Sequence, residues 1–297
     1  AGVFKTAKDR GANKVYGMLH GIQGLLQERY VDLEDHIKND LDIELLKRTP
    51  SAYLGSCRFK LPDISQDREI YDKIFDILNK LEIEYFFYIG GNDSMDTIKK
   101  LSDYSLLNGS NIRFMGVPKT IDNDLAATDH TPGYGSAAKY IGSITKEVIR
   151  DGLVYDQQNV TILEIMGRNA GWLTGAAALA KCEDCEGPDM IFLPEVTFDV
   201  DEFMHKVAEL HKKKKSVVVA VSEGVKTADG RYVCELTDGI EFVDAFGHKQ
   251  LTGTARFLAE KINREVGCKT RAIEFNSLQR CASHIVSRVD ITEAYQV

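Results

Sequence analysis

Residues 83–95 read Ile-Glu-Tyr-Phe-Phe-Tyr-Ile-Gly-Gly-Asn-Asp-Ser-Met, and this stretch contains the junction that decides the fold. The run Ile83–Ile89 is almost entirely apolar and aromatic, which is typical of a strand buried on both faces of a parallel sheet. Gly90 and Gly91 end the run, and apolar residues then recur at helical spacing over Met95–Leu101. The stretch therefore predicts a buried strand, a tight glycine turn and a helix.

The same alternation of strand and helix continues along the chain. Further strands are predicted at 112–117, 160–165, 190–193, 216–222 and 271–275. Further helices are predicted around 140–148, 170–181, 199–213 and 252–266. Repeated β-α-β units indicate an α/β protein with one or two open, mostly parallel sheets.

Composition excludes several classes of protein. With 297 residues, of which 43% are hydrophobic and 28% charged, the chain is an ordinary globular protein with room for a substantial core. The longest apolar runs, 85–89 and 217–221, are too short to cross a bilayer, and we see no signal peptide. The formal charge of −8 argues against a nucleic-acid partner, so an anionic substrate needs a local basic cluster. We expect a cytoplasmic protein.

The cysteines and the two ends of the chain give weaker signals. Cys182 and Cys185 form a C-x-x-C, but no second pair follows at zinc-ribbon spacing, so we expect all six cysteines to be reduced structural thiols. Residue 1 is Ala, and the helical patterns at 1–7 and 292–295 have no natural beginning or end. We expect a chain truncated at both ends.

Three unusual segments fall where strands end, which is where open α/β sheets bind ligands. The first is 90–94, Gly-Gly-Asn-Asp-Ser, whose glycines let backbone amides approach a phosphate at a helix amino terminus. Ser94 is expected to cap that helix. The alternative interpretation is a tight strand-to-helix turn without a ligand.

The second segment is 118–124, Pro-Lys-Thr-Ile-Asp-Asn-Asp. Two carboxylates this close repel each other unless a cation lies between them. A site that binds Mg²⁺ through one carboxylate and orients a hydroxyl with the other would need this cluster. An Asx-rich capping loop is the structural alternative.

The third segment is 166–172, Met-Gly-Arg-Asn-Ala-Gly-Trp. It places Arg168 at the expected start of a helix, where the helix dipole favours anions over cations. An arginine at this position is better explained by a phosphate that it must contact.

Together with Gly55-Ser56-Cys57-Arg58 and the stretch 271–280, these segments form a set that resembles the phosphofructokinase family over nearly the whole chain. The resemblance implies a two-lobed α/β fold with Rossmann-like three-layer lobes and mostly parallel sheets. It implies a phosphoryl-donor lobe at 1–133 plus 278–297 and a fructose 6-phosphate lobe at 134–277. The implied activity is phosphorylation of the 1-hydroxyl of fructose 6-phosphate by ATP or pyrophosphate, with Mg²⁺, in a homo-oligomer (dimer or tetramer).

Residue roles follow from the same resemblance. It makes Asp122 the catalytic base and Asp124 its partner near the metal, with Thr120 beside the transferred phosphoryl group. The implied sugar-phosphate contacts are Met166, Gly167, Arg168, Glu223, Arg271 and Arg280. The implied donor-phosphate contacts are Gly91, Asn92, Asp93, Ser94 and Arg58, and the implied metal ligands are Asp93 and Asp124. Arg58, Lys119, Arg168 and Mg²⁺ would supply the positive field that phosphoryl transfer needs.

Two departures from the nucleotide-using members point to pyrophosphate as donor. Asp93 replaces the last glycine of their Gly-Gly-Asp-Gly-Ser loop, and Lys119 replaces the glycine before Thr120. An aspartate near a nucleotide's α-phosphate adds bulk and repulsion of about 1 kcal/mol in water, or about 4 at an effective dielectric of 20. The alternatives left open are an ATP-dependent enzyme, a non-catalytic regulatory subunit, and a lipid or nicotinamide-nucleotide kinase with a similar loop.

Other departures concern subunit sharing. Ser277 stands where the nucleotide branch has a histidine, and Asn159 where it has an arginine often contributed by a neighbouring subunit. The family's first glycine-rich loop, on a strand that would precede Ala1, is not in this sequence.

Overall fold

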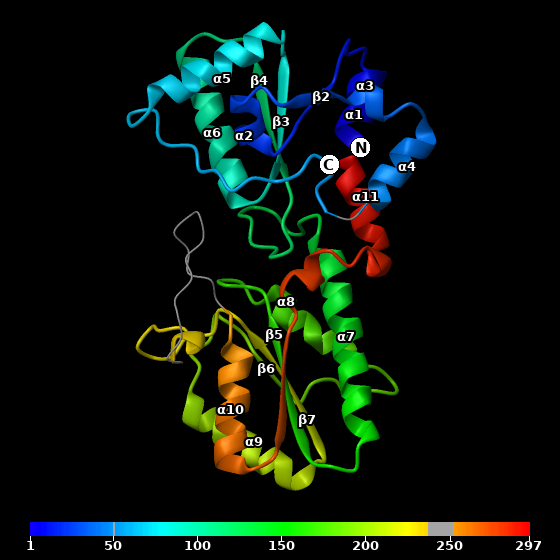
Figure 1. The fold of residues 1–297 in the computed structure, drawn as a ribbon, viewed down its shortest axis with the longest axis vertical. Coiled ribbons are helices and arrows are strands. Elements are labelled where there is room, and N and C mark those ends of the chain that lie inside the picture. The colour runs from blue at the N-terminus through cyan, green and yellow to red at the C-terminus, as the bar shows by residue number, and fades with distance from the viewer. Residues whose placement is uncertain (50, 237–251) are drawn as a thin grey trace.

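The computed structural model describes residues 1–49, 51–236 and 252–297, which form two lobes stacked along the long axis (Figure 1). The first lobe runs from α1 (Gly2–Asp9) to β4 (Arg113–Pro118), and the second from α7 (Tyr134–Val154) to β8 (Lys269–Glu274). The last helix, α11 (Arg288–Gln296), returns to the first lobe. The lobe boundaries given above remain a prediction.

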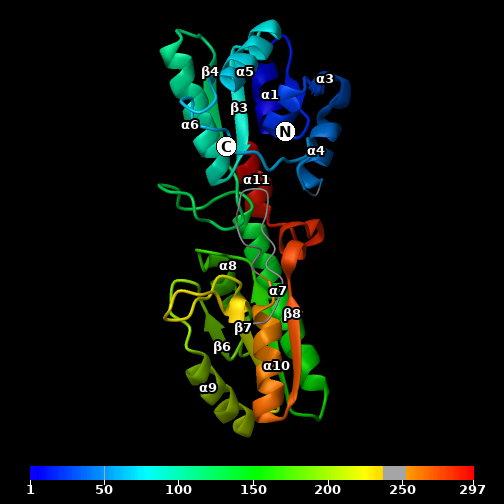
Figure 2. The same cartoon turned by 60° about the vertical axis from the view of Figure 1, so that its left-hand side comes forward.

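The second lobe is built on a four-stranded parallel sheet in the order β6–β7–β5–β8. Its other strands are β5 (Asn159–Ile165), β6 (Met190–Phe192) and β7 (Ser216–Ser222). The connecting elements are α8 (Trp172–Gly175), the 3₁₀ helices η1 (Ala176–Ala180) and η2 (Val233–Leu236), α9 (Val200–Lys213) and α10 (Thr254–Val266). The carboxyl ends of all four strands point toward the first lobe, with β8 at one edge of the sheet (Figure 2).

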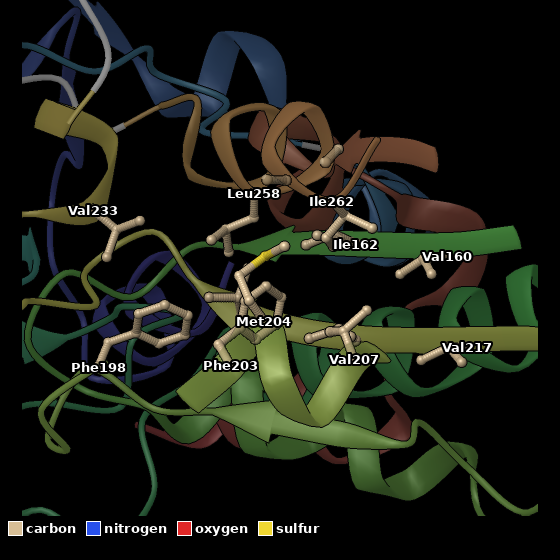
Figure 3. Close-up of a cluster of buried hydrophobic side chains, with 14 of the residues drawn as sticks. Val160, Ile162, Phe198, Phe203, Met204, Val207, Val217, Val233, Leu258 and Ile262 are labelled. Atoms are coloured by element: carbon tan, nitrogen blue, oxygen red, sulfur yellow. The ribbon is translucent and has the colours of Figure 1, made fainter. Parts of the chain in front are cut away.

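Alternate residues of the central strands feed two separate cores. Val160 and Ile162 of β5 pack with Val217 of β7 against α9 and α10, and all three side chains are fully buried (Figure 3). Leu163 on β5 packs instead with Ile141 of α7 on the opposite face. Because a strand turns successive side chains to opposite faces, β5 and β7 are covered by helices on both sides. The three-layer arrangement is therefore present in this lobe.

The first lobe has two small sheets. The strands β3 (Tyr85–Gly90) and β4 pair in parallel, whereas β1 (Tyr16–Met18) and β2 (Tyr30–Asp32) pair antiparallel. The helices of this lobe are α2 (Gly21–Leu26), α3 (Leu33–His36), α4 (Asp40–Arg48), α5 (Arg68–Lys80) and α6 (Asn92–Leu107). Helices α2, α5 and α6 share one core with β3 and β4, while the alternate side chains Tyr85, Phe87, Ile89 and Met115 on the two strands are exposed.

Three local predictions are wrong. The strand at 83–89 is not buried on both faces, because helices cover only one face of β3 and β4 among the described residues. Helix α6 begins at Asn92 with Gly91 as its N-cap, so Ser94 is not the cap but lies in the first turn. A Cβ on Gly90 would lie 2.0 Å from the Ser94 hydroxyl oxygen, so the missing side chain of Gly90 lets Ser94 pack there. The helix expected at 170–181 is only α8 followed by η1, since Gly171 and Gly175 weaken a regular helix. Arg168 consequently lies in a loop, not at a helix start.

After β8 the chain returns to the first lobe through η3 (Asn276–Arg280), η4 (Ser283–Ile285) and α11. Tyr295 of α11 packs against the small core formed by Phe4, Ile37 and Ile43, and the Lys47 ammonium lies 3.9 Å from the centre of its ring. Among the described residues, no helix has the length and apolar character needed to span a membrane.

The buried Glu164 at the end of β5 predicts a pH dependence of stability. Its carboxylate accepts the backbone N–H groups of Gly253 (3.3 Å) and Ala255 (2.7 Å) at the start of α10. Burial, the largest cause, nevertheless raises its pKa to about 7, and Glu274 adds repulsion. Since the unfolded value is near 4.5, its contribution to stability is complete below that pH and is lost as pH rises to about 7.

We expect Glu164→Gln to remove about 3 kcal/mol from the difference in unfolding free energy between pH 4.5 and pH 8. Urea unfolding at a series of pH values measures the slope of unfolding free energy against pH. The exposed Glu265→Gln on α10 is the control and should leave the slope unchanged. An unchanged slope in Glu164→Gln would contradict the assignment.

Candidate active site

The segment after β4 lies beside the amino terminus of α6. The Lys119 N–H donates to the Gly90 carbonyl oxygen at 2.9 Å, which extends the pairing of β3 and β4 past the strand ends. The side-chain amide of Asn92 then donates to Asp124 Oδ2 at 3.1 Å. Two segments that the sequence singled out separately are therefore in contact, and Asn92 orients one of the paired carboxylates.

A network of short-range hydrogen bonds fixes the loop that carries Asp122. Its N–H donates to Thr120 Oγ1 at 3.2 Å. Buried Asn123 adopts a left-handed conformation (φ 55°), and its Oδ1 accepts from both the N–H (2.8 Å) and the hydroxyl (2.7 Å) of Thr131. Thr120 also pairs with Gly133 in an isolated parallel bridge. The loop is thus closed by the Asn123–Thr131 hydrogen bonds and by the Thr120–Gly133 bridge. Asp122 and Asp124 lie on either side of Asn123.

The carboxyl group of Asp122 has a raised pKa. Burial is the largest cause and the negative charge of Asp124 is the second, while Arg280, Lys119 and the Thr120 hydroxyl act in the opposite direction. A carboxylate destabilised in this way holds a proton more strongly than one in water. Asp122 is therefore suited to accept a proton from a hydroxyl group.

The turn after β5 forms the second lobe's part of the site. Gly167 has φ 138°, its N–H donates to Glu223 Oε1 at 3.3 Å, and its carbonyl accepts from the Ser222 hydroxyl at 2.6 Å. A Cβ on Gly224 would lie only 2.0 Å from the Arg168 carbonyl oxygen. The ends of β5 and β7 are therefore locked together through backbone contacts that only glycine permits.

Glu223 connects the two lobes electrostatically. Burial raises its pKa to about 7, the charges of Glu164 and Asp122 add to the rise, and the Gly167 N–H and Arg168 oppose it. Met166 donates its N–H to Gln279 Oε1 at 3.3 Å, which brings the segment of Arg280 to the same edge. The structure therefore brings most of the expected sugar-phosphate residues together, facing Asp122.

Arg271 is the exception: within one chain it does not lie with the others, and its role in sugar-phosphate binding stays a prediction. It pairs with Thr161 in the sheet register, five residues before Met166, which places it about 16 Å back along the strand direction. Its guanidinium binds Asp151 at 2.7 Å and lies 5.5 Å from the ring centre of Tyr155. With Asn159 and Lys269 it lines a shallow pocket at the far end of the lobe.

The expected donor-phosphate residues lie around the start of α6. Gly91 is the N-cap, and the exposed Asn92 and Asp93 form the first turn with Ser94, where backbone N–H groups lack helical partners. The segment of Arg58 lies next to β3, since the Cys57 sulfur is 3.9 Å from the Tyr88 hydroxyl. An anion at this helix end would meet both the N–H groups and the positive end of the helix dipole.

The donor atoms at this junction fit Mg²⁺. Asp122, Asp124 and Asp93 offer hard carboxylate oxygens, and the charge of Asp124 contributes, after burial, to the raised pKa of Asp122. Within the described ranges, no group of three or more acidic, histidine or cysteine side chains is assembled to hold a metal. Mg²⁺ is usually bound by one or two carboxylates plus substrate phosphates and water, so the residues present are sufficient.

Sequence reasoning missed Asp290. This residue is only 6% exposed, and its two oxygens accept the N–H groups of Gly133 (2.9 Å) and Ser136 (2.5 Å) at the start of α7. Gly133 is the bridge partner of Thr120, so a carboxylate on the last helix holds the base of the catalytic loop. The only local signal was Ser287-x-x-Asp290, which reads as a helix start and says nothing of a partner 157 residues away.

The fold and the site define an α/β enzyme in which paired carboxylates lie between two lobes at the carboxyl ends of parallel strands. The sequence profile of the family "Phosphofructokinase" matches residues 1–293, and the chain belongs to this family.

Several relatives in the family are similar over the whole chain. The pyrophosphate–fructose 6-phosphate 1-phosphotransferase of Halomonas elongata is 40% identical over 97% of this chain and 68% of its own length. The enzyme of the same name from Xanthomonas campestris pv. campestris is 40% identical over 100% of this chain and 70% of its own. A crystal structure of pyrophosphate-dependent phosphofructokinase from Nitrosospira multiformis matches with TM-score 0.85 and 36% identity, covering 99% of this chain and 69% of that one.

We expect Asp290→Asn to lower kcat while changing KM little. An amide keeps one acceptor oxygen and loses the other, so either Gly133 or Ser136 is left unpaired and the loop base shifts. The loss of one buried hydrogen bond should also reduce unfolding free energy by about 1–3 kcal/mol. Steady-state kinetics with urea unfolding measure both effects, and the exposed Thr292→Ala on α11 is the control. Lower stability with an unchanged kcat would refute the positioning role.

Gly224→Ala should disable the turn that carries Arg168. The new methyl group cannot coexist with the Arg168 carbonyl, so the backbone moves by a substantial fraction of an ångström. Misplacement on that scale can reduce kcat/KM on the order of 100-fold. Gly175→Ala is the matched control, since its Cβ would meet nothing within 4 Å. Equal kinetics in the two variants would contradict the argument.

Proposed function

We propose that this protein transfers a phosphoryl group from pyrophosphate to the 1-hydroxyl of fructose 6-phosphate, giving fructose 1,6-bisphosphate and phosphate in a reversible glycolytic step. The observation that carries the proposal is Asp122, a largely buried carboxylate with a raised pKa, between the cations Lys119 and Arg280. The names of the 40%-identical relatives support the same reaction.

In this mechanism Asp122 accepts the proton of the sugar's 1-hydroxyl as that oxygen attacks the terminal phosphorus. The bond from phosphorus to the bridging oxygen breaks, and the departing phosphate takes the electron pair. The raised pKa of Asp122 makes it a stronger base toward the hydroxyl. Thr120 holds the Asp122 backbone and places its hydroxyl beside the transferred group.

The remaining residues bind and orient the two substrates. Met166, Gly167, Arg168, Glu223 and Arg280 hold the sugar phosphate at the ends of β5 and β7. Gly91, Asn92, Asp93, Ser94 and Arg58 hold the donor at the start of α6. Mg²⁺, bound through Asp124 and Asp93, would neutralise charge on the transferred phosphoryl group.

Asp93 and Lys119 determine which phosphoryl donor the enzyme uses. Asp93 lies in the first turn of α6, where its charge also favours the helix dipole, and Lys119 follows β4 beside Gly90. A nucleotide's α-phosphate near Asp93 would meet repulsion of up to about 4 kcal/mol at an effective dielectric of 20, roughly a thousandfold in affinity. Lys119 places an ammonium where phosphate departs, which glycine cannot do.

The active protein would be a homo-oligomer, and Arg271 supports this part of the proposal. Arg271 and Lys269 form a cationic edge of an exposed pocket that the active site of the same chain does not use. A sugar phosphate bound in a partner subunit would be a second anion for Arg271, besides Asp151.

The direct test is an assay of the full-length protein with fructose 6-phosphate and Mg²⁺, comparing pyrophosphate with ATP. We expect turnover with pyrophosphate and at least about a hundredfold lower kcat/KM with ATP, given the repulsion estimated above. Turnover with ATP alone would support the alternative, an ATP-dependent enzyme. A relative from Corynebacterium efficiens that is 32% identical is named ATP-dependent 6-phosphofructokinase. Absence of turnover with either donor would support a regulatory subunit.

Asp93→Gly combined with Lys119→Gly tests the physical reason for the choice. ATP should become a better donor relative to pyrophosphate. Asp96→Asn is the control, since Asp96 lies one turn further along α6 and pairs with Lys100 at 2.8 Å. If the double variant gains nothing with ATP, repulsion at position 93 does not decide the donor.

A further inference from the structure

Cys182 and Cys185 face each other across a two-residue hairpin that follows η1. The Cys182 N–H donates to the Cys185 carbonyl at 2.9 Å, and the Cys185 N–H donates to the Cys182 carbonyl at 3.2 Å. In such a hydrogen-bonded antiparallel pair the Cα atoms are about 5.5 Å apart and both side chains lie on one face. A disulfide needs a Cα separation of about 4.4–6.8 Å, so the backbone already holds the two thiols at a bridging distance.

The surroundings of Cys182 favour reactivity at one sulfur. Cys182 is exposed, and its sulfur lies 3.1 Å from the ammonium nitrogen of Lys146 on α7. Asp184 also lies 3.1 Å from this sulfur, but its carboxylate is bound by Lys146 at 2.7 Å and by Arg150. Cys182 is therefore an exposed sulfur in contact with a cation, the kind of position in which reactive cysteines are found.

The other cysteines provide the contrast. All six are free. Burial raises the pKa of Cys234 to about 11 and also raises the pKa of Cys268, so these thiols are poorly ionised. Cys185 is only 8% exposed, which suits a thiol that reacts second. Cys281 is exposed and serves as an internal reference.

We propose that Cys182 and Cys185 form a redox-modification site, at which a hydroperoxide converts the dithiol into an intramolecular disulfide. The Cys182 thiolate attacks one oxygen of hydrogen peroxide, the S–O bond forms, the O–O bond breaks, and the released hydroxide takes a proton to give water. The Cys185 sulfur then attacks the sulfenic acid, the S–S bond forms, and a second water leaves. Two thiols are oxidised by two electrons in total, and one peroxide is reduced to two waters.

The test treats reduced full-length protein with hydrogen peroxide, stops the reaction by alkylation, and follows each cysteine by peptide mass spectrometry. We expect a 182–185 disulfide that dithiothreitol reverses and that forms faster than Cys281 is oxidised. In Cys185→Ser, Cys182 should accumulate as a sulfenic acid that dimedone labels.

The role of Lys146 is tested separately. Lys146→Gln should slow Cys182 oxidation by at least about threefold, because it removes the cation 3.1 Å from the attacking sulfur. Lys146→Arg keeps the cation and should retain the rate. Lys261→Gln, which removes the ammonium of a helical ion pair elsewhere in the lobe, should have no effect.

Three results would overturn the proposal. Cys182 could react no faster than Cys281, it could bridge to a cysteine other than Cys185, or Lys146→Gln could leave the rate unchanged.

Discussion

Negative charge is crowded at the junction of the two lobes, and the arrangement of the site depends on how it is held there. Burial is the main reason that Asp122 and Glu223 have raised pKa values, and the charge of Asp124 adds to the rise at Asp122, as the charge of Asp122 does at Glu223. The fold opposes this repulsion with cations from both lobes and with backbone N–H groups. The polypeptide chain and its hydrogen bonds hold these carboxylates together despite their repulsion. The cluster therefore attracts any further cation that enters the junction.

The first turn of α6 shows how one side chain can serve stability and selectivity together. Asp93 is favourable for the helix because it lies at the positive end of the dipole. The same charge disfavours a longer polyphosphate passing over that turn. The proposed discrimination between donors by Asp93 would therefore not weaken the protein.

Much of the fold followed from local pattern. The run at 216–222 is the strand β7 residue for residue, and β5 begins one residue before its predicted start, because buried parallel strands carry continuous apolar runs. The polar segments after β3 and β4 do meet, since these two parallel strands present their carboxyl ends at one edge, whereas β5 ends in the separate sheet of the other lobe. Local sequence pattern did not predict contacts between residues that are far apart in the sequence. Asp290 binds residues 154 and 157 positions earlier, and nothing near it in sequence indicates that.

Arg271 and Arg280 illustrate a different limit. They are nine residues apart and shared one inferred role, but a strand advances about 3.3 Å per residue and carries them to opposite ends of the sheet. Similarly, Ser94 is a good capping residue by type, but Gly90 gives it another place to pack. Residue type alone does not distinguish these outcomes.

The return of α11 to the first lobe means that this lobe is assembled from two separate stretches of the polypeptide. The chain passes between the lobes twice, once into α7 and once after η3. A single genetic crossover in the middle of the gene could therefore never exchange one intact lobe for a homologous one. The two halves of the gene must therefore be inherited together. A recombined hybrid would place α11 of one parent against the Asp122 loop of the other.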